Sequence, residues 1–143
     1  MRIYADTSVF GGVFDSEFAA PSKQFFAEVD AGRFSLVTSA IVAAEIEPAP
    51  NHVRGLFEHY ITLAEVVGVS GSAISLQQQY IDSGFIVTHA EQDALHVAVA
   101  TVSKCVLIVI WNFKHIVHFD KLPKFNAVNT LMGHGQIGVY SPL

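Results

Sequence analysis

Hydrophobic residues in this chain alternate between short continuous runs and longer stretches with helical spacing. A short apolar run bounded by turn residues is typical of a buried strand, whereas apolar residues three and four positions apart indicate a helix. The pattern predicts strands at residues 3–5, 34–38, 66–69, 105–110 and 137–140. It predicts helices at residues 22–31, 40–47, 53–63, 71–82, 88–103 and 125–132, and a helical turn near residues 113–117.

Several helix boundaries carry local signals. Ser39 precedes the helix at residues 40–47 and is the predicted N-cap, and Pro48 stops that helix. Pro21 stands just before the predicted start of the helix at residues 22–31. The segment from Thr88 to Glu91 matches the S/T-x-x-E capping box and predicts where the most apolar helix begins. Because that helix is apolar almost all round, we expect it to be buried.

Alternation of strands and helices predicts βαβ units and therefore a mainly parallel sheet with helices on both faces. The sequence shows no repeat, linker or low-complexity tract, so we expect one α/β domain spanning residues 1–143. In open sheets of this class, sites form outside the carboxyl ends of the strands. Asp6, Ser39 and Asn112 each lie at or just past the end of a predicted strand.

Composition adjusts this picture. The hydrophobic fraction is 51%, charged residues make up 15%, and the mean hydropathy is +0.41. A buried parallel sheet and an apolar oligomer interface would account for such values. The longest run without a polar residue covers residues 105–111, far short of the roughly 20 that a bilayer requires. The start of the chain does not resemble a signal peptide, and the single cysteine, Cys105, excludes an internal disulfide, so we expect a cytoplasmic protein.

Charge is unevenly distributed along the chain. The formal net charge of −5 argues against simple binding to polyanions. Residues 1–104 hold 12 acids and 5 bases, however, whereas residues 105–143 hold one acid, three lysines and three histidines. A polyanion could therefore approach the C-terminal part, especially if a metal ion neutralised some of the acids.

Three acidic residues are not readily explained by a solvated face. Asp6 lacks the partner of a capping box, Glu45 lies late in a short helix, and Asp93 lies within the most apolar helix. A structural alternative stays open for each of them. Asp6 could be an N-cap only and Glu45 could simply be exposed. Asp93 could pair with His96, three residues further on, along an exposed stripe of the helix, and a histidine there is more typical of packing or support than of catalysis.

Three converging carboxylates would require a cation. Two carboxylates about 5 Å apart repel by roughly 3 kcal/mol at an effective dielectric constant of about 20, so three do not all remain ionised unaided. Oxygen ligands alone favour Mg²⁺ or Mn²⁺. His115 and His118 are too sparse for a zinc site. The sequence has no phosphate-binding glycine motif and no nucleophile elbow.

Four segments together resemble the PIN-domain family, and within it the VapC-like toxin group. They are YADTSVFGG, TSAIVAAEIEPAP, EQDALHVAVA and WNFKHIVH, and their order spans nearly the whole chain. The resemblance implies a three-layer α/β/α domain with a central, mainly parallel sheet. It also implies Mg²⁺- or Mn²⁺-dependent ribonuclease activity, frequent homodimers and, for many relatives, silencing by an antitoxin protein.

Carried over by position, the resemblance assigns Asp6, Glu45 and Asp93 as catalytic metal ligands. Ser8 matches a position that orients the first acid or a bound water. Asn112 stands where many PIN domains have an aspartate; its amide oxygen can bind a metal ion but brings no negative charge.

The resulting hypothesis is metal-assisted hydrolysis of phosphodiester bonds in single-stranded RNA by the toxin of a type II toxin–antitoxin pair. Lys114 and His115 are the expected phosphate contacts, with a solvated turn as the alternative for both. The competing hypothesis is a PIN-fold binding module with little or no nuclease turnover. A receiver-like signalling domain is disfavoured because the paired acids expected at the first strand are missing.

Overall fold

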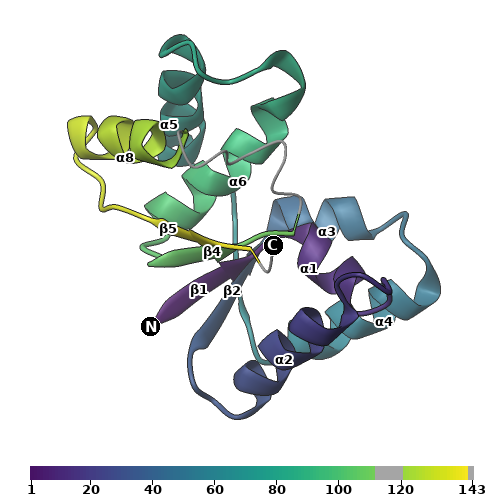
Figure 1. Ribbon diagram of the computed structural model, residues 1–143. Coiled ribbons are helices and arrows are strands. Elements are labelled where there is room, and N and C mark those ends of the chain that lie inside the picture. Colours follow the sequence, from purple (N-terminus) through teal and green to yellow (C-terminus); the bar gives the residue numbers. More distant parts are fainter. Residues whose placement is uncertain (112–120, 142–143) are drawn as a thin grey trace.

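The computed structural model describes residues 1–111 and 121–141, which form a five-stranded parallel sheet covered by helices (Figure 1). The strands are β1 (Arg2–Ala5), β2 (Ser35–Ser39), β3 (Glu65–Val67), β4 (Leu107–Val109) and β5 (Gly138–Tyr140). Their order in the sheet is β3-β2-β1-β4-β5, and all four pairings are parallel. The chain therefore builds one half of the sheet, crosses back over β1 and builds the other half.

Helices cover both faces of this sheet (Figure 1). One layer consists of α1 (Thr7–Gly12), α2 (Ala19–Asp30), α3 (Ala40–Ile46) and α4 (Asn51–Tyr60). The other consists of α5 (Gly71–Asp82), η1 (Thr88–Ala90), α6 (Glu91–Val102) and α8 (Lys121–Leu131). The predicted three-layer α/β/α arrangement is confirmed. Among the described residues, no helix is long and apolar enough to cross a membrane.

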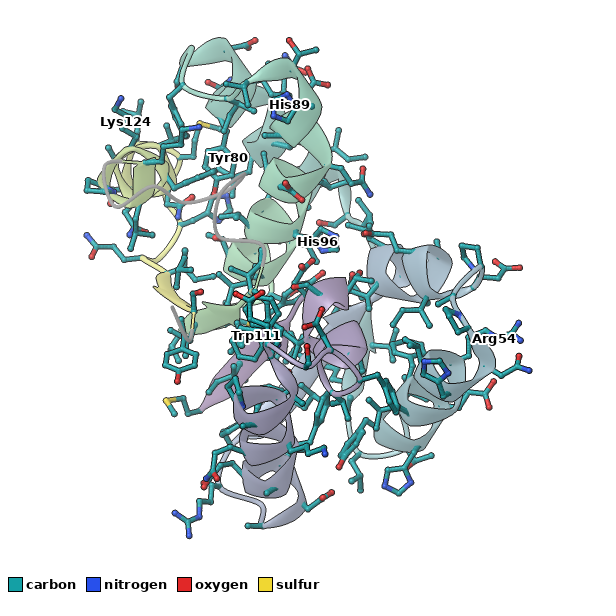
Figure 2. All side chains as sticks on the ribbon, turned by 45° about the vertical axis from the view of Figure 1, so that its right-hand side comes forward. Arg54, Tyr80, His89, His96, Trp111 and Lys124 are labelled. Atoms are coloured by element: carbon teal, nitrogen blue, oxygen red, sulfur yellow. The ribbon has the colours of Figure 1, made fainter. Side chains whose placement is uncertain are left out.

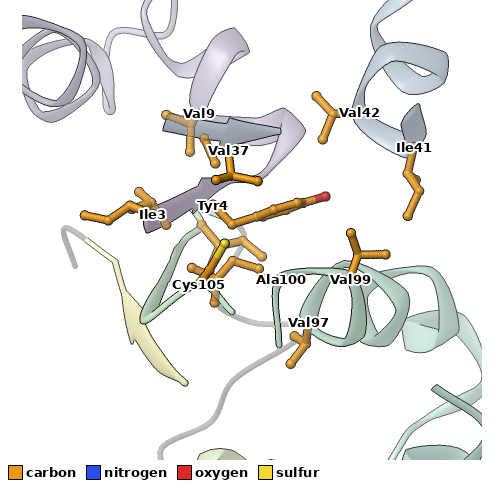
Figure 3. Close-up of a cluster of buried hydrophobic side chains, with 14 of the residues drawn as sticks. Ile3, Tyr4, Val9, Val37, Ile41, Val42, Val97, Val99, Ala100 and Cys105 are labelled. Carbon is orange, nitrogen blue, oxygen red and sulfur yellow. The ribbon is translucent and has the colours of Figure 1, made fainter. Parts of the chain in front are cut away.

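The core lies where the central strand meets both helical layers. Tyr4 of β1 is paired in register with Val37 of β2 and Ile108 of β4, and all three are fully buried. Figure 3 shows the Tyr4 ring among apolar side chains from both layers, with its hydroxyl pointing toward the space between α3 and α6. A polar atom in such a core requires a hydrogen-bond partner, because an unpaired one is costly to bury.

Most predicted elements lie within one to three residues of the observed ones. The helix at residues 71–82 is found with the same bounds. Ser39 caps α3 as expected, its Oγ accepting a hydrogen bond from the Val42 amide at 3.3 Å. The helical turn expected near residues 113–117 lies outside the described residues, as do Asn112, Lys114 and His115.

Three predicted helix starts are wrong. Helix α8 begins at Lys121 rather than at residue 125 and has Pro123 in its first turn. Helix α2 begins at Ala19 rather than after Pro21, since a proline in the first turn removes an amide that would have no helical partner in any case. The capping box at Thr88 does not form: α6 has Ala90 at its N-cap position and no side-chain cap. A 3-10 turn replaces it, closed by the Ala90 amide on the Val87 carbonyl at 2.9 Å.

One close approach ties α1 to the chain leaving β4. A Cβ atom on Gly12 would lie 2.5 Å from both the Ser22 hydroxyl oxygen and the Trp111 ring, so only glycine fits there. The Trp111 indole N–H donates to Ser22 Oγ at 2.6 Å. This contact fixes the ring just past the end of β4, next to the end of β1.

Candidate functional site

The carboxyl ends of β1, β2 and β4 converge at the point where the strand order reverses. Asp6 directly follows β1, and its amide donates to the Val109 carbonyl at the end of β4 at 3.1 Å. Ser39 closes β2 and starts α3, which carries Glu45. Crevices at such a switch point are where ligands bind in open α/β sheets.

Asp6 is buried, with 6% of its surface exposed, and one of its carboxylate oxygens is held locally. Oδ2 accepts hydrogen bonds from the Ser8 hydroxyl at 2.8 Å and the Ser8 amide at 3.3 Å, so Asp6 is also the N-cap of α1. Ser8 Oγ in turn accepts from the Trp111 amide at 3.1 Å. The capping alternative for Asp6 is therefore realised, but it occupies only Oδ2 and leaves Oδ1 directed elsewhere.

His96 brings the first two predicted acids together. Its Nε2 lies 2.5 Å from Glu45 Oε1 and 3.4 Å from Asp6 Oδ1. Glu45 is partly exposed, whereas His96 is almost completely buried at 1%. In Figure 2, His96 lies where α6 faces α1 and α3. Both carboxylates thus approach the same ring nitrogen from different elements of the fold.

The other ring nitrogen of His96 belongs to a buried chain of hydroxyls. Nδ1 lies 2.7 Å from Tyr4 Oη, and Tyr4 Oη lies 2.7 Å from Ser39 Oγ. The Tyr4 and His96 rings meet edge to face, with centroids 5.9 Å apart. All three residues are at most 1% exposed.

Electrostatics at this point favour a positive charge on the imidazole. Burial acts to lower the pKa of His96, but the hydrogen bond with Glu45 and the charges of Asp6, Glu45 and Asp93 outweigh it, so the pKa is raised. Burial raises the pKa of the Tyr4 hydroxyl, which therefore stays protonated and available as a donor. The carboxylates of Asp6 and Glu45 thus share one imidazole whose charged form they favour.

Asp93 lies in the first turn of α6, three residues before His96, and is partly exposed. It is near enough for its charge to raise the pKa of His96. Within residues 1–111 and 121–141, however, no group of three or more histidine, cysteine, aspartate or glutamate side chains is arranged to hold a metal ion. The carboxylates of Asp6 and Glu45 both approach His96 Nε2, and the negative charge of Asp93 acts on the same imidazole.

The donor chemistry fits a hard divalent cation. Asp6 and Glu45 offer carboxylate oxygens, which suit Mg²⁺ and Mn²⁺. His96 Nε2 contacts one oxygen of each, and Ser8 donates to the second oxygen of Asp6. A carboxylate oxygen can accept from more than one partner, so these contacts leave capacity for a cation. Two carboxylates are fewer ligands than such a cation takes, so the described residues provide only part of a ligand set.

Sequence reasoning placed Ser39 at the same sheet edge as Asp6 and gave His96 a packing or supporting role, but it missed Tyr4 and the contacts of His96 with Asp6 and Glu45. The structural alternative of an exposed stripe is wrong for His96, which is buried; the other interpretation, a histidine that packs beside or supports a carboxylate, agrees with its burial and its bond to Glu45. Tyr4 and Asp6 are two positions apart on an extended segment, so their side chains leave on the same side. Together with His96 three residues after Asp93, that spacing could have indicated that Tyr4 and His96 lie near the acids. The roles expected for Asn112, Lys114 and His115 stay predictions.

No family model matches the chain, and no curated protein matches it. Solved structures do. The chain superposes with a TM-score of 0.63 at 13% identity on VapBC2 from Rickettsia felis bound to a DNA fragment from the promoter, covering 99% of this chain and 98% of that one. FitAB bound to the IR36 DNA fragment and FitAcB from Neisseria gonorrhoeae give the same TM-score and identity. These two matches cover 98% of this chain and 94% and 97% of theirs, respectively.

The comparison defines the class of fold. A five-stranded parallel sheet flanked by helices, matched over almost the full length, is a PIN-like fold. The fold expected from the VapC-like resemblance is therefore confirmed.

Proposed function

We propose that this protein is a metal-dependent endoribonuclease that hydrolyses phosphodiester bonds of single-stranded RNA. The observation that carries the proposal is the convergence of Asp6 and Glu45 on one nitrogen at the strand-order reversal of a PIN-like sheet. A carboxylate pair at that position, with Asp93 beside it, matches the acids that the sequence resemblance assigned. Asp93 and Asn112 would complete the ligand set.

The residues would divide the work in the following way. Asp6 and Glu45 would hold Mg²⁺ or Mn²⁺, and Ser8 would keep Asp6 oriented through the bond to Oδ2. A cation bound there supplies a water of lowered pKa and charge stabilisation for in-line attack on a phosphodiester. Hydrolysis of this kind leaves a 5′-phosphate and a 3′-hydroxyl. Lys114 and His115 would contact the substrate phosphates.

The partners form part of the same proposal. Two of the similar solved structures are assemblies bound to DNA fragments, one of them VapBC2, which supports a role as the toxin of a type II toxin–antitoxin pair with an antitoxin protein as partner. Exposed apolar side chains such as Leu131 and Ile74, together with the high hydrophobic content, support a homodimer. Light scattering of the purified chain tests the dimer directly. We propose a cytoplasmic location, because the single cysteine, Cys105, excludes an internal disulfide.

Cleavage of RNA in the presence of Mn²⁺ tests the proposal. The double variant Asp6→Asn with Asp93→Asn removes two charges from the site. We expect it to lose cleavage, while a matched double variant with Glu65→Gln and Asp82→Asn, which removes two exposed charges elsewhere, keeps it. Undiminished cleavage by the first variant would overturn the assignment of the acids.

One observation favours a second candidate function. Among the described residues no three acidic or histidine groups are arranged for metal binding, and Asn112 brings no charge. A PIN-fold module that binds RNA or a protein partner without turnover would have these properties. Binding of RNA that is unaffected by Mn²⁺, with no cleavage products after long incubation, is the result that selects this alternative.

A further inference from the structure

A closed circuit of hydrogen bonds begins and ends on helix α3. Ser39 Oγ caps the helix by accepting from the Val42 amide and also bonds to Tyr4 Oη. Tyr4 Oη bonds to His96 Nδ1, and His96 Nε2 bonds to Glu45, in the last turn of the same helix. The orientation of the Glu45 side chain is thus coupled to both ends of the helix that carries it.

This circuit of hydrogen bonds passes through an apolar part of the core. Tyr4 has Val37, Val42 and Val99 around it in the core (Figure 3). Apolar residues of similar volume fill such a space at no desolvation cost, whereas buried polar groups must all be paired. Buried networks in which every member is paired make a structure rigid at that point. In this network, the paired groups restrict the positions of the Glu45 and Asp6 carboxylates.

We infer that His96 is a positioning residue of the proposed metal site, with its ring held by Tyr4 and Ser39 so that Nε2 hydrogen-bonds one oxygen of Glu45 and lies within ion-pair distance of one oxygen of Asp6. The inference rests on the proposed function and identifies a residue that sets the geometry of that same site. Glu45 is partly exposed, and without the bond to His96 its side chain would populate several rotamers. Holding it in advance removes that ordering cost from metal binding.

The role has a distinctive consequence. Tyr4 touches neither carboxylate in any of the hydrogen bonds described, yet its hydroxyl supports the ring that does. Removing that hydroxyl should therefore weaken metal binding at a distance. Groups that hydrogen-bond metal ligands typically change metal affinity or activity by about 10- to 100-fold when they are removed.

The test is Mn²⁺ affinity measured by electron paramagnetic resonance on the full chain, with no RNA present. His96→Asn keeps an amide near the position of Nδ1 and loses the contact with Glu45. His96→Gln places an amide donor near the position of Nε2 and keeps that contact. We expect Mn²⁺ affinity to fall about 10- to 100-fold in His96→Asn and to be partly restored in His96→Gln, which keeps the contact with Glu45 but not the bond to Tyr4 Oη. Tyr4→Phe, which preserves the ring and the core, is expected to lose affinity in the same direction.

Urea unfolding of the metal-free variants separates positioning from general stability. The inference is supported if His96→Gln and His96→Asn differ in Mn²⁺ affinity while their free energies of unfolding are similar. It is overturned, with the proposed function intact, if wild type binds Mn²⁺ and His96→Asn binds it equally well. It is also overturned if the affinities of all variants follow their stabilities. Wild type that binds no Mn²⁺ overturns both the inference and the metal dependence of the proposed function.

Discussion

Charged residues are arranged differently at the two ends of the central sheet. At the amino end, Arg2 pairs with Glu65 beside an open hollow of about 890 Å³, and both side chains are substantially exposed. At the carboxyl end, Asp6 and Glu45 converge on a buried histidine. The first arrangement pairs opposite charges in water, whereas the second gathers like charges in the protein.

The difference teaches where to look for function. Exposed ion pairs contribute about 0–1 kcal/mol and need no further explanation. Gathering like charges at a buried point is unfavourable unless positive charge is shared among them, and here His96 is one positive group facing Asp6, Glu45 and the charge of Asp93. The carboxyl end therefore has a chemical requirement that the amino end lacks. Variants that move charge at one end and not the other can break or sharpen this contrast.

The largest effect is expected from one matched pair of substitutions. Glu45→Gln keeps an acceptor for His96 but removes the negative charge that would hold the metal ion. Because the metal stabilises the transition state by several kcal/mol, we expect RNA cleavage to slow by roughly 10²-fold or more. Glu65→Gln removes the same charge at the amino end and should leave the cleavage rate unchanged. Single-turnover cleavage rates at saturating Mn²⁺ measure both. Equal losses in the two variants would remove the functional distinction between the ends.

A smaller effect is expected beside the carboxyl end, at Gly12. A Cβ atom there would overlap Ser22 Oγ and the Trp111 ring, so Gly12→Ala should lower the free energy of unfolding by about 1–3 kcal/mol. Gly11→Ala, one position earlier in the same helix, meets nothing within 4 Å and should be neutral or stabilising by up to about 1 kcal/mol. Urea unfolding compares the two. If Gly12→Ala is as stable as Gly11→Ala, the close approach of the Trp111 ring is wrong.

The smallest effect is expected at the amino end. A double-mutant cycle with Arg2→Met and Glu65→Gln should give a coupling free energy of about 0.2–1 kcal/mol for this exposed pair. The coupling should shrink as ionic strength rises, because salt screens exposed charges. Chemical unfolding at low and high salt measures it. A coupling above about 2 kcal/mol that is insensitive to salt would show that the amino end is not the simple surface described above.

The sequence was sufficient to predict the fold class, because buried strands appear as short continuous apolar runs and helices as longer segments with apolar residues three and four positions apart. It also placed Asp6 and Glu45 at one edge, since carboxyl ends of parallel strands share that edge. It did not reveal the bond from His96 to Glu45, which joins residues 51 positions apart and depends on how α6 packs against α3. Nor could it foresee the 3-10 turn at Thr88, where backbone bonding replaced the side-chain cap.

The most direct test of the central claim is a crystal structure of the protein grown with Mn²⁺, with anomalous scattering data collected to locate the metal. The account predicts a peak within about 2.6 Å of oxygen atoms of both Asp6 and Glu45. A structure at saturating Mn²⁺ with no peak between these two carboxylates, or with the metal bound elsewhere in the molecule, would contradict it.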